Sequence, residues 1–246
     1  MRLLDEFSIQ MYSVNDYFHK DYKATLEKLG NKGFGYAAVE FAGYGDISAE
    51  DMDKALKANG LRVIGNHTDL KSLVSNLDND ISYAKAIGSE YILCSWADMN
   101  TKADAVDAAK KMTAVLEKAE AAGMKFGYHN HAHEFIKDDG EYLLDILFDN
   151  LPESAVMELD VYWTEHAGID TLAFMEKNKD RLELMHIKQI DKDKNNVDLD
   201  NGLIDFTEVI KKAKTYGVKH FVLEQEKHNG PSIESVERAI NYIRSL

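Results

Sequence analysis

The chain has 246 residues, with 43 acidic against 29 basic side chains and a formal net charge of −14. This charge argues against a nucleic-acid partner, because phosphate binding needs clustered Lys and Arg. A hydrophobic content of 45% excludes disorder as the main state. The one cysteine, Cys94, cannot form an intramolecular disulfide, and no run approaches the ~18 apolar residues of a membrane span. Residues 1–6 lack the apolar stretch of a signal peptide, so we expect a cytoplasmic protein without a membrane partner.

Short β-rich runs alternate with longer helical patterns along the whole chain. Each run is rich in Val, Ile, Leu, Phe or Tyr without clean alternation, which is typical of strands buried on both faces. The predicted strands are Phe7–Tyr12, Tyr36–Glu40, Arg62–His67, Tyr91–Ser95, Lys125–His129, Val156–Asp160, Leu184–Lys188 and Phe221–Glu224. The predicted helices are Tyr22–Leu29, Ala49–Ala58, Asn76–Ala86, Ala103–Ala122, Tyr142–Asn150, Thr171–Lys177, Phe206–Thr215 and Ile233–Ser245.

The helix boundaries carry their own signals. Ser48, Thr101 and Asp205 each precede a helical pattern with an acidic residue three positions on, which is typical of N-terminal capping. Several helices run into a glycine followed by a strand, as at Gly60 and Gly217.

This order of elements predicts the fold class. Strict strand–helix alternation implies parallel strands with right-handed crossovers. Eight such units favour a closed barrel over an open doubly wound sheet, and Tyr12–Asp16 lacks the Gly-rich phosphate turn that an open sheet would place after its first strand. No linker divides the chain, so we predict an α/β protein with a single (β/α)8 TIM barrel domain over residues 1–246.

Polar side chains gather where the predicted strands end. A lone His or Glu at a strand end is usually a solvated loop residue, but nearly every strand here ends in His, Glu, Asp, Asn or Gln. Burying so many ionisable side chains around one barrel mouth is costly unless they pair with one another or bind a cation. His129, Asp160, His186 and Glu224 lie on consecutive strands, and two imidazoles with two carboxylates suit Mn²⁺, Zn²⁺, Fe²⁺ or Co²⁺.

Strand alternation indicates which of these side chains face the same way. Residues two apart share a face, which pairs His129 with His131, Glu158 with Asp160, His186 with Lys188, and Glu224 with Glu226. The member nearer the strand end is expected to reach substrate, while the other holds metal or fills the barrel. The alternative for the run around His131 is an exposed histidine stripe without function.

Four runs resemble the sugar phosphate isomerase/epimerase family of the xylose isomerase-like barrels. They are Gly127–His131, Glu158–Trp163, His186–Gln189 and Val222–Glu226, and Gln10–Ser13 and Gly202–Phe206 add further similarity. The resemblance covers essentially the whole chain. It implies a (β/α)8 barrel with one divalent metal, most often Mn²⁺, with Zn²⁺, Co²⁺, Fe²⁺ or Mg²⁺ as alternatives.

The resemblance also implies which residues hold the metal. Asp160, His186 and Glu224 match three of the family's ligand positions, and the fourth falls on His129, where many members have Glu. Either His129 takes that role or another residue completes the site, for which Glu134 is the candidate. Trp163 replaces a histidine common in the family and offers a stacking surface for a sugar face.

The expected chemistry is isomerisation or epimerisation of a sugar, keto sugar or cyclitol through a metal-stabilised enediolate. We expect Glu224 to position metal and serve as base, with Glu158, Glu226 or Lys188 as acid/base partner. The predicted substrate contacts are His67, His131, Trp163, Glu226 and Glu40.

Other functions are weighed against this one. The same enolate chemistry would give a dehydratase or lyase on a 3-keto sugar, and a non-catalytic sugar-binding barrel is a further alternative. An endonuclease IV-like nuclease is disfavoured by the negative charge. The Asp191–Asn196 loop carries mixed charge instead of a Gly-rich phosphate cradle, which favours an unphosphorylated substrate. Homo-oligomerisation is left open.

Overall fold

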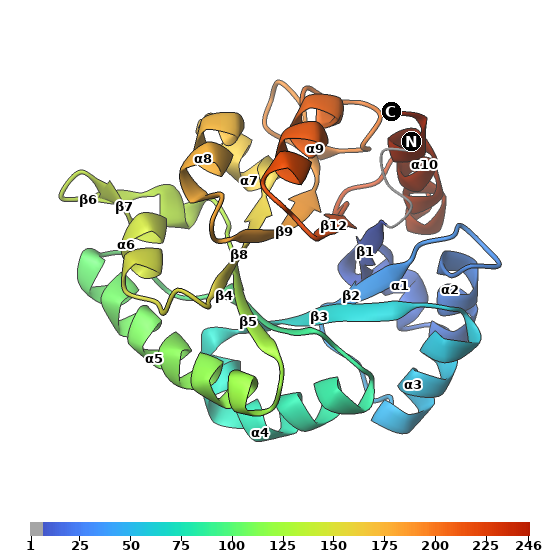
Figure 1. Ribbon diagram of the computed structural model, residues 1–246. Coiled ribbons are helices and arrows are strands. Elements are labelled where there is room, and N and C mark those ends of the chain that lie inside the picture. The colour runs from blue at the N-terminus through green and yellow to red at the C-terminus, as the bar shows by residue number, and fades with distance from the viewer. Residues whose placement is uncertain (1–6) are drawn as a thin grey trace.

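A computed structural model describes residues 7–246 of the chain, and in it eight parallel strands close into a barrel enclosed by helices (Figure 1). Successive barrel strands along the chain are neighbours in space, and the last strand pairs with the first. The barrel strands are β1 (Ser8–Gln10), β2 (Ala38–Phe41), β3 (Arg62–Asp69), β4 (Tyr91–Trp96), β5 (Lys125–His129), β8 (Val156–Asp160), β9 (Leu182–Ile187) and β12 (His220–Leu223). The predicted fold class is therefore confirmed.

The helices between the strands form the outer layer. They are α2 (Tyr22–Leu29), α3 (Ala49–Ala58), α4 (Leu70–Ala86), α5 (Lys102–Ala121), α6 (Leu143–Asp149), α8 (Thr171–Asn178), α9 (Phe206–Thr215) and α10 (Ser232–Ser245). The prediction for α4 was wrong at its start, which lies six residues before Asn76. Asp69 ends β3 and accepts a hydrogen bond from the Ser72 N–H, so the helix begins as soon as the strand ends.

Several short elements lie after the barrel strands. They were not predicted from the sequence. They are η1 (Met11–Val14), α1 (Asn15–Phe18), η2 (His133–Phe135), α7 (Val161–His166), the hairpin β6 (Lys137–Asp138) with β7 (Glu141–Tyr142), and the hairpin β10 (Gln189–Ile190) with β11 (Asn196–Val197). Each is too short to show a hydrophobic period. The predicted first strand is also shorter than expected, because the chain turns into η1 at Met11.

An apolar plug fills the lower part of the barrel interior. It consists of Ala38, Ile64, Tyr91, Leu93, Val156 and Leu184. Leu93 lies between two glycines, and a Cβ added at Gly65 or Gly127 would approach its methyl groups to 2.5 or 2.8 Å. Because Gly65 and Gly127 have no side chain, Leu93 fits between them and closes the lower end of the barrel interior. Polar residues of the barrel interior therefore gather above the plug, toward the carboxyl ends of the strands.

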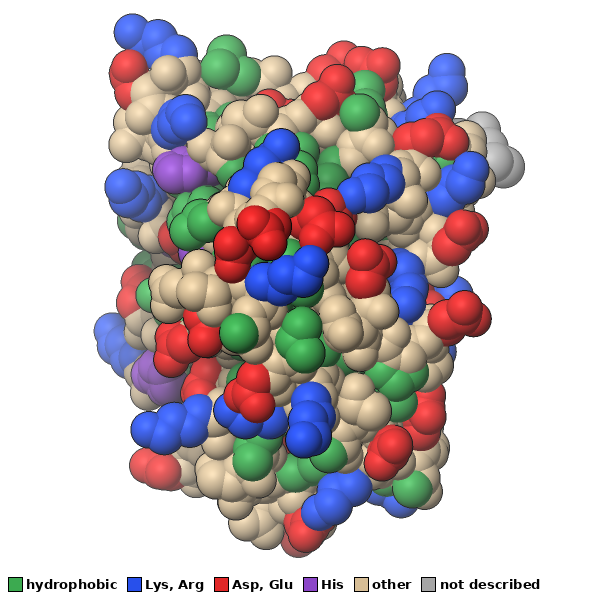
Figure 2. Space-filling view, turned by 90° about the vertical axis from the view of Figure 1, so that its left-hand side faces the viewer, with side chains coloured by type: hydrophobic (Ala, Val, Ile, Leu, Met, Phe, Trp, Pro, Cys, Tyr) green, Lys and Arg blue, Asp and Glu red, His purple; other side chains and the backbone are tan. Residues whose placement is uncertain are grey.

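The outer surface carries both signs of charge. Figure 2 shows acidic and basic side chains interspersed over the face that lies on the left of Figure 1. No helix within residues 7–246 is both long enough and apolar enough to cross a membrane.

Candidate functional site

A cavity of about 560 Å³ opens at the carboxyl ends of the strands. Its wall includes Gln10 from β1, His67 from β3 and His129 from β5, with Glu224 just beyond β12. These strands lie on different sides of the barrel, so the cavity sits over the barrel axis.

Asp160, His186 and Glu224 form the upper of two groups that can hold a metal, with ligand atoms all within 4.8 Å of one another. Asp160 ends β8 and caps α7, and its Oδ1 accepts hydrogen bonds from the N–H groups of Tyr162 (2.8 Å) and Trp163 (3.2 Å). Its Oδ2 is buried and has no hydrogen-bond partner. One oxygen is thus fixed by the helix start, and the other is left for a ligand.

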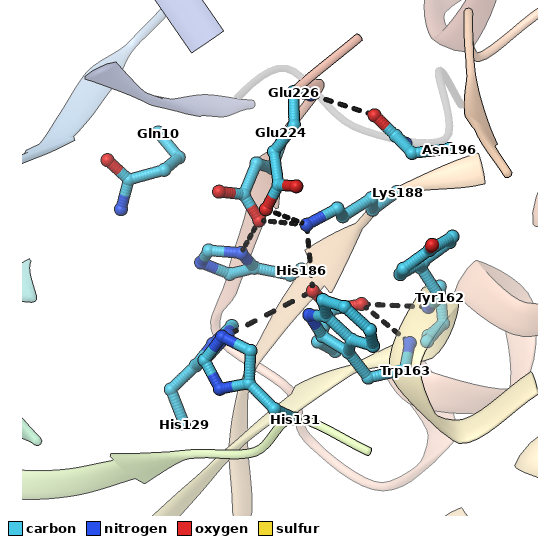
Figure 3. A network of polar contacts seen from close by, with 12 residues as sticks. Gln10, His129, His131, Tyr162, Trp163, His186, Lys188, Asn196, Glu224 and Glu226 are labelled. Atoms are coloured by element: carbon cyan, nitrogen blue, oxygen red, sulfur yellow. Dashed lines mark hydrogen bonds and ion pairs between the residues drawn. The ribbon is translucent and has the colours of Figure 1, made fainter. Parts of the chain in front are cut away.

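The fully buried ammonium of Lys188 lies against this upper group (Figure 3). Its Nζ is 2.5 Å from Glu226 Oε1, 3.2 Å from Glu224 Oε2 and 3.9 Å from Asp160 Oδ2. Burial alone would lower the pKa of Lys188, but the surrounding carboxylates hold it above its usual value. Burial also raises the pKa of Asp160 to about 7, although the ammonium opposes this shift. Lys188 is therefore a fixed positive charge beside the carboxylates of the upper group.

His67, His129, Glu158 and His186 form the lower group, which again places its ligand atoms within 4.8 Å of one another. Glu158 Oε2 lies 2.8 Å from His67 Nε2 and 3.2 Å from His129 Nδ1. His186 Nε2 lies 3.5 Å from Glu158 Oε1. The lower and upper groups share His186, whose Nδ1 lies 3.0 Å from Glu224 Oε2.

Glu40 completes this buried network. Its Oε1 lies 2.7 Å from His186 Nε2 and 3.0 Å from His67 Nε2, and it accepts a hydrogen bond from Gln10 (2.9 Å). Burial would raise the pKa of Glu40, but the imidazoles of His67 and His186 hold it well below its usual value. Conversely, the pKa of His67 rises to about 9 despite burial, because Glu40 and Glu158 stabilise its charged form. The network is thus a layer of paired buried charges.

His129 differs from the other imidazoles of the lower group. Burial and the neighbouring imidazoles of His186 and His67 lower its pKa well below the usual value. Its ring is therefore neutral, and the one polar neighbour of its buried Nδ1 in the lower group is Glu158 Oε2 at 3.2 Å. A neutral imidazole has one unprotonated nitrogen, and this is the form that binds a metal.

Residues 27–246 match the family described as xylose isomerase-like TIM barrel. The chain belongs to this family. Within the fold it is similar to a sugar phosphate isomerase/epimerase from Parabacteroides distasonis ATCC 8503, at 23% identity over 98% of this chain and 93% of that one, with a TM-score of 0.83. No curated protein matches the sequence significantly.

Two solved structures of lower sequence identity show the same fold. The probable 3-DHS dehydratase AsbF of Bacillus anthracis is 12% identical over 97% of this chain and 98% of its own, with a TM-score of 0.76. The IolI protein, whose structure has a bound zinc atom, is 12% identical over 98% of both chains, with a TM-score of 0.74. At these identities the likeness establishes the fold alone.

The four metal ligands expected from the family divide between the two groups. Asp160 and Glu224 belong to the upper group, His129 to the lower one, and His186 to both. The register of the strands explains this division. His129 lies opposite Glu158 where β5 pairs with β8, whereas Asp160 lies opposite His186 where β8 pairs with β9. Glu134, the alternative fourth ligand, belongs to neither group and instead accepts hydrogen bonds from Tyr128 Oη and the His131 N–H.

The predicted substrate contacts lie at different depths. His67, His131 and Glu226 line the cavity. Glu40 lies beneath it in the buried network, and Trp163 packs beside His131 with ring centroids 5.3 Å apart. Lys188 Nζ lies 5.2 Å from the centroid of the Trp163 ring.

Two asparagines that position the site were not predicted. Asn130 accepts a hydrogen bond from the Asp160 N–H (3.0 Å), and its place directly after β5 was the only signal in the sequence. Asn196 on β11 accepts hydrogen bonds from the N–H groups of Glu226 and Lys227, which fixes the segment after β12 (Figure 3). Nothing in the sequence around Asn196 marks this role.

Proposed function

We propose that this barrel is a divalent-metal-dependent isomerase or epimerase of a sugar, keto sugar or cyclitol. The observation that carries the proposal is the position of Lys188 between Glu224 and Glu226, beside the upper metal-binding group. An acid, a base and a cation site then adjoin one cavity, which is the set that proton transfer next to a carbonyl requires.

The upper group fits a divalent cation. Asp160, His186 and Glu224 would hold it, since two carboxylates and an imidazole suit Mn²⁺ as well as Zn²⁺, Co²⁺ or Fe²⁺. The buried, unpartnered Oδ2 of Asp160 supports this assignment. A cation at this position supplies Lewis-acid chemistry, polarising a carbonyl oxygen and acidifying the adjacent C–H.

Side chains within and beside the upper group would move the proton. Burial would raise the pKa of Glu224, but Lys188 and His186 keep it well below the usual value, so the carboxylate is ionised and able to accept a proton. The Lys188 ammonium would donate a hydrogen bond to a substrate oxygen. The Glu226 side chain is 35% exposed, so it would exchange protons with solvent. Glu158 Oε2 lies 2.8 Å from Nε2 of His67, which lines the cavity, so Glu158 would act on the substrate through that imidazole.

The cavity wall supports an unphosphorylated substrate. Among the described residues that line it, none is Lys or Arg, and the Lys188 ammonium nearby is already paired with Glu224 and Glu226. His67, His131 and Trp163 would hold sugar hydroxyls or a sugar face. A cytoplasmic location and the lack of nucleic-acid and membrane partners stay predictions of the sequence.

Deuterium uptake from solvent tests this function. The protein, loaded with Mn²⁺, is incubated in D₂O with a panel of ketoses, 3-keto sugars and cyclitols. We expect deuterium at the carbon next to the carbonyl for at least one substrate, with loss of about 10² or more in rate for Glu224→Gln. The matched control is Glu237→Gln on the exposed face of α10.

The products separate the alternatives. A product that has lost a substituent next to the labelled carbon identifies the dehydratase or lyase reaction, which uses the same residues. Substrate binding without any deuterium uptake across the panel, in metal-loaded protein, would contradict an enzymatic role and favour a sugar-binding barrel.

A further inference from the structure

We propose that His67, His129, Glu158 and His186 are a second transition-metal site, one layer below the upper group. This inference goes beyond the proposed function, since it concerns a cation held inside the barrel instead of at the substrate. The four side chains come from β3, β5, β8 and β9 and place their ligand atoms within 4.8 Å of one another. His129, Glu158 and His186 are each at most 2% exposed.

Two buried ligand atoms of this lower group make no hydrogen bond of good geometry. Glu158 Oε1 lies 3.5 Å from His186 Nε2, and His129 Nδ1 lies 3.2 Å from Glu158 Oε2, so each has only an ion-pair contact inside the group. A buried polar atom without a well-formed hydrogen bond is costly. Both atoms converge with the other ligand atoms of the group, and a cation bound among them would satisfy both.

The surroundings of the lower group supply the charge and orientation that a cation needs. Glu40 and Glu158 bring two negative charges, which match a divalent ion. The outer nitrogen of His186 lies 3.0 Å from Glu224 Oε2, and that of His129 lies 4.0 Å from Asp160 Oδ2. A carboxylate on the far side of a ligating imidazole orients the ring and raises its basicity.

The two groups differ in the metal they would select. Three imidazoles and one carboxylate favour Zn²⁺ or Co²⁺ over Mg²⁺, whereas the upper group has two carboxylates and a single imidazole. The upper group also has the Lys188 ammonium 3.2 Å from Glu224 Oε2, and that positive charge competes with a cation. No Lys or Arg within residues 7–246 forms an ion pair with the lower group, so a divalent ion there would displace only protons on the imidazoles of His67 and His186, and the group is the stronger site for an imidazole-preferring metal.

The test measures metal binding by the full chain without any substrate. Co²⁺ is titrated into metal-free protein and followed by visible absorption, with His67→Gln and His129→Gln for the lower group and Asp160→Asn for the upper group. We expect Co²⁺ affinity to fall about tenfold or more in both histidine variants. The control His220→Gln, at the opposite end of the barrel, should change it by less than about threefold, and Asp160→Asn, which keeps all four ligands of the lower group, should lower it less than either histidine variant does.

A second measurement on the unaltered protein guards against variants that do not fold. With one equivalent of Cu²⁺ bound, pulsed electron paramagnetic resonance counts the coordinated imidazoles, and we expect three. Fewer than three imidazoles would overturn the proposal, as would Co²⁺ affinity that depends on Asp160 but not on His67 or His129. Deuterium uptake is scored separately, so isomerase activity can survive the failure of this inference, and the inference can survive an inactive protein.

Discussion

His186 is the residue on which both layers of the site depend. Its Nδ1 faces Glu224 at the cavity, and its Nε2 faces Glu40 and Glu158 inside the barrel. Burial alone would lower the pKa of His186, but these carboxylates hold it well above the usual value. The ring is therefore fixed from both sides, and each layer constrains the geometry of the other.

Removing the charge of Glu40 should destabilise the metal-free protein. Glu40→Gln keeps the shape of the side chain but leaves His67 and His186 without one of their carboxylates. We expect the free energy of unfolding, measured by urea denaturation at neutral pH with EDTA present, to fall by about 3 kcal/mol. Glu50→Gln is the control, because its pair with Lys54 is exposed and contributes little. Equal stability of the two variants would show that the buried charges do not hold the strands together.

At the scale of elements, the two ends of the barrel are built differently. The carboxyl ends carry the buried ionisable network, whereas the amino ends are tied by partly exposed ion pairs around Glu183 on β9. Glu183 accepts hydrogen bonds from Tyr91 Oη of β4 (2.5 Å), from Lys125 of β5, and from Lys219 directly before β12 (2.8 Å). One side chain thus connects four strands at the end of the barrel opposite the cavity.

Glu183 should make the stability of the barrel depend on acid pH. Burial would raise the pKa of Glu183, but Lys125, Lys219 and Tyr91 lower it to about 2. A group with a lowered pKa in the folded state stabilises the fold above its unfolded pKa of roughly 4.3, and this contribution is lost as the pH falls toward 2.

The matching variant is Glu183→Gln. Because the site is partly solvated, we expect it to cost only about 1 kcal/mol at pH 7, and to cost progressively less between roughly pH 4.3 and pH 2. Chemical denaturation of both proteins across this range measures the difference. A difference that does not change with pH would mean that the carboxylate acts through packing and not through its charge.

At the scale of the whole molecule, the sequence contains enough to specify the barrel. The bounds of α2, α3 and α9 agree with prediction, because capping residues and terminal glycines mark them locally. α7 was missed because it has only six residues and its cap, Asp160, also ends a strand. Local signals thus define long elements and overlook short ones.

The depth of each site residue could not be predicted in the same way. Strand alternation predicts that Glu158 and Asp160 both face the barrel interior, but it does not predict how far each lies below the barrel mouth. Depth follows from the stagger between strands, which sets His129 beside Glu158 and Asp160 beside His186. Stagger arises from closing all eight strands together, so no single segment encodes it. Glu40 was predicted to contact substrate because it ends a strand, and the stagger places it in the buried layer beneath the cavity.

Metal removal should weaken the barrel as a whole, because the two proposed cation sites draw on β3, β5, β8 and β9 with the residue after β12. A ligand that binds only the folded state stabilises it by about 2.7 kcal/mol at 100 times its Kd. For a chain of this size, that corresponds to a rise in Tm of roughly 5–10 °C. The shift is measured by thermal unfolding in the presence of Co²⁺ and in the presence of EDTA. Ca²⁺ at the same concentration as Co²⁺ controls for general ionic effects, because Ca²⁺ prefers oxygen ligands. A Tm that is the same in all three conditions would contradict both cation sites, and a shift with Co²⁺ alone would indicate a site rich in imidazole.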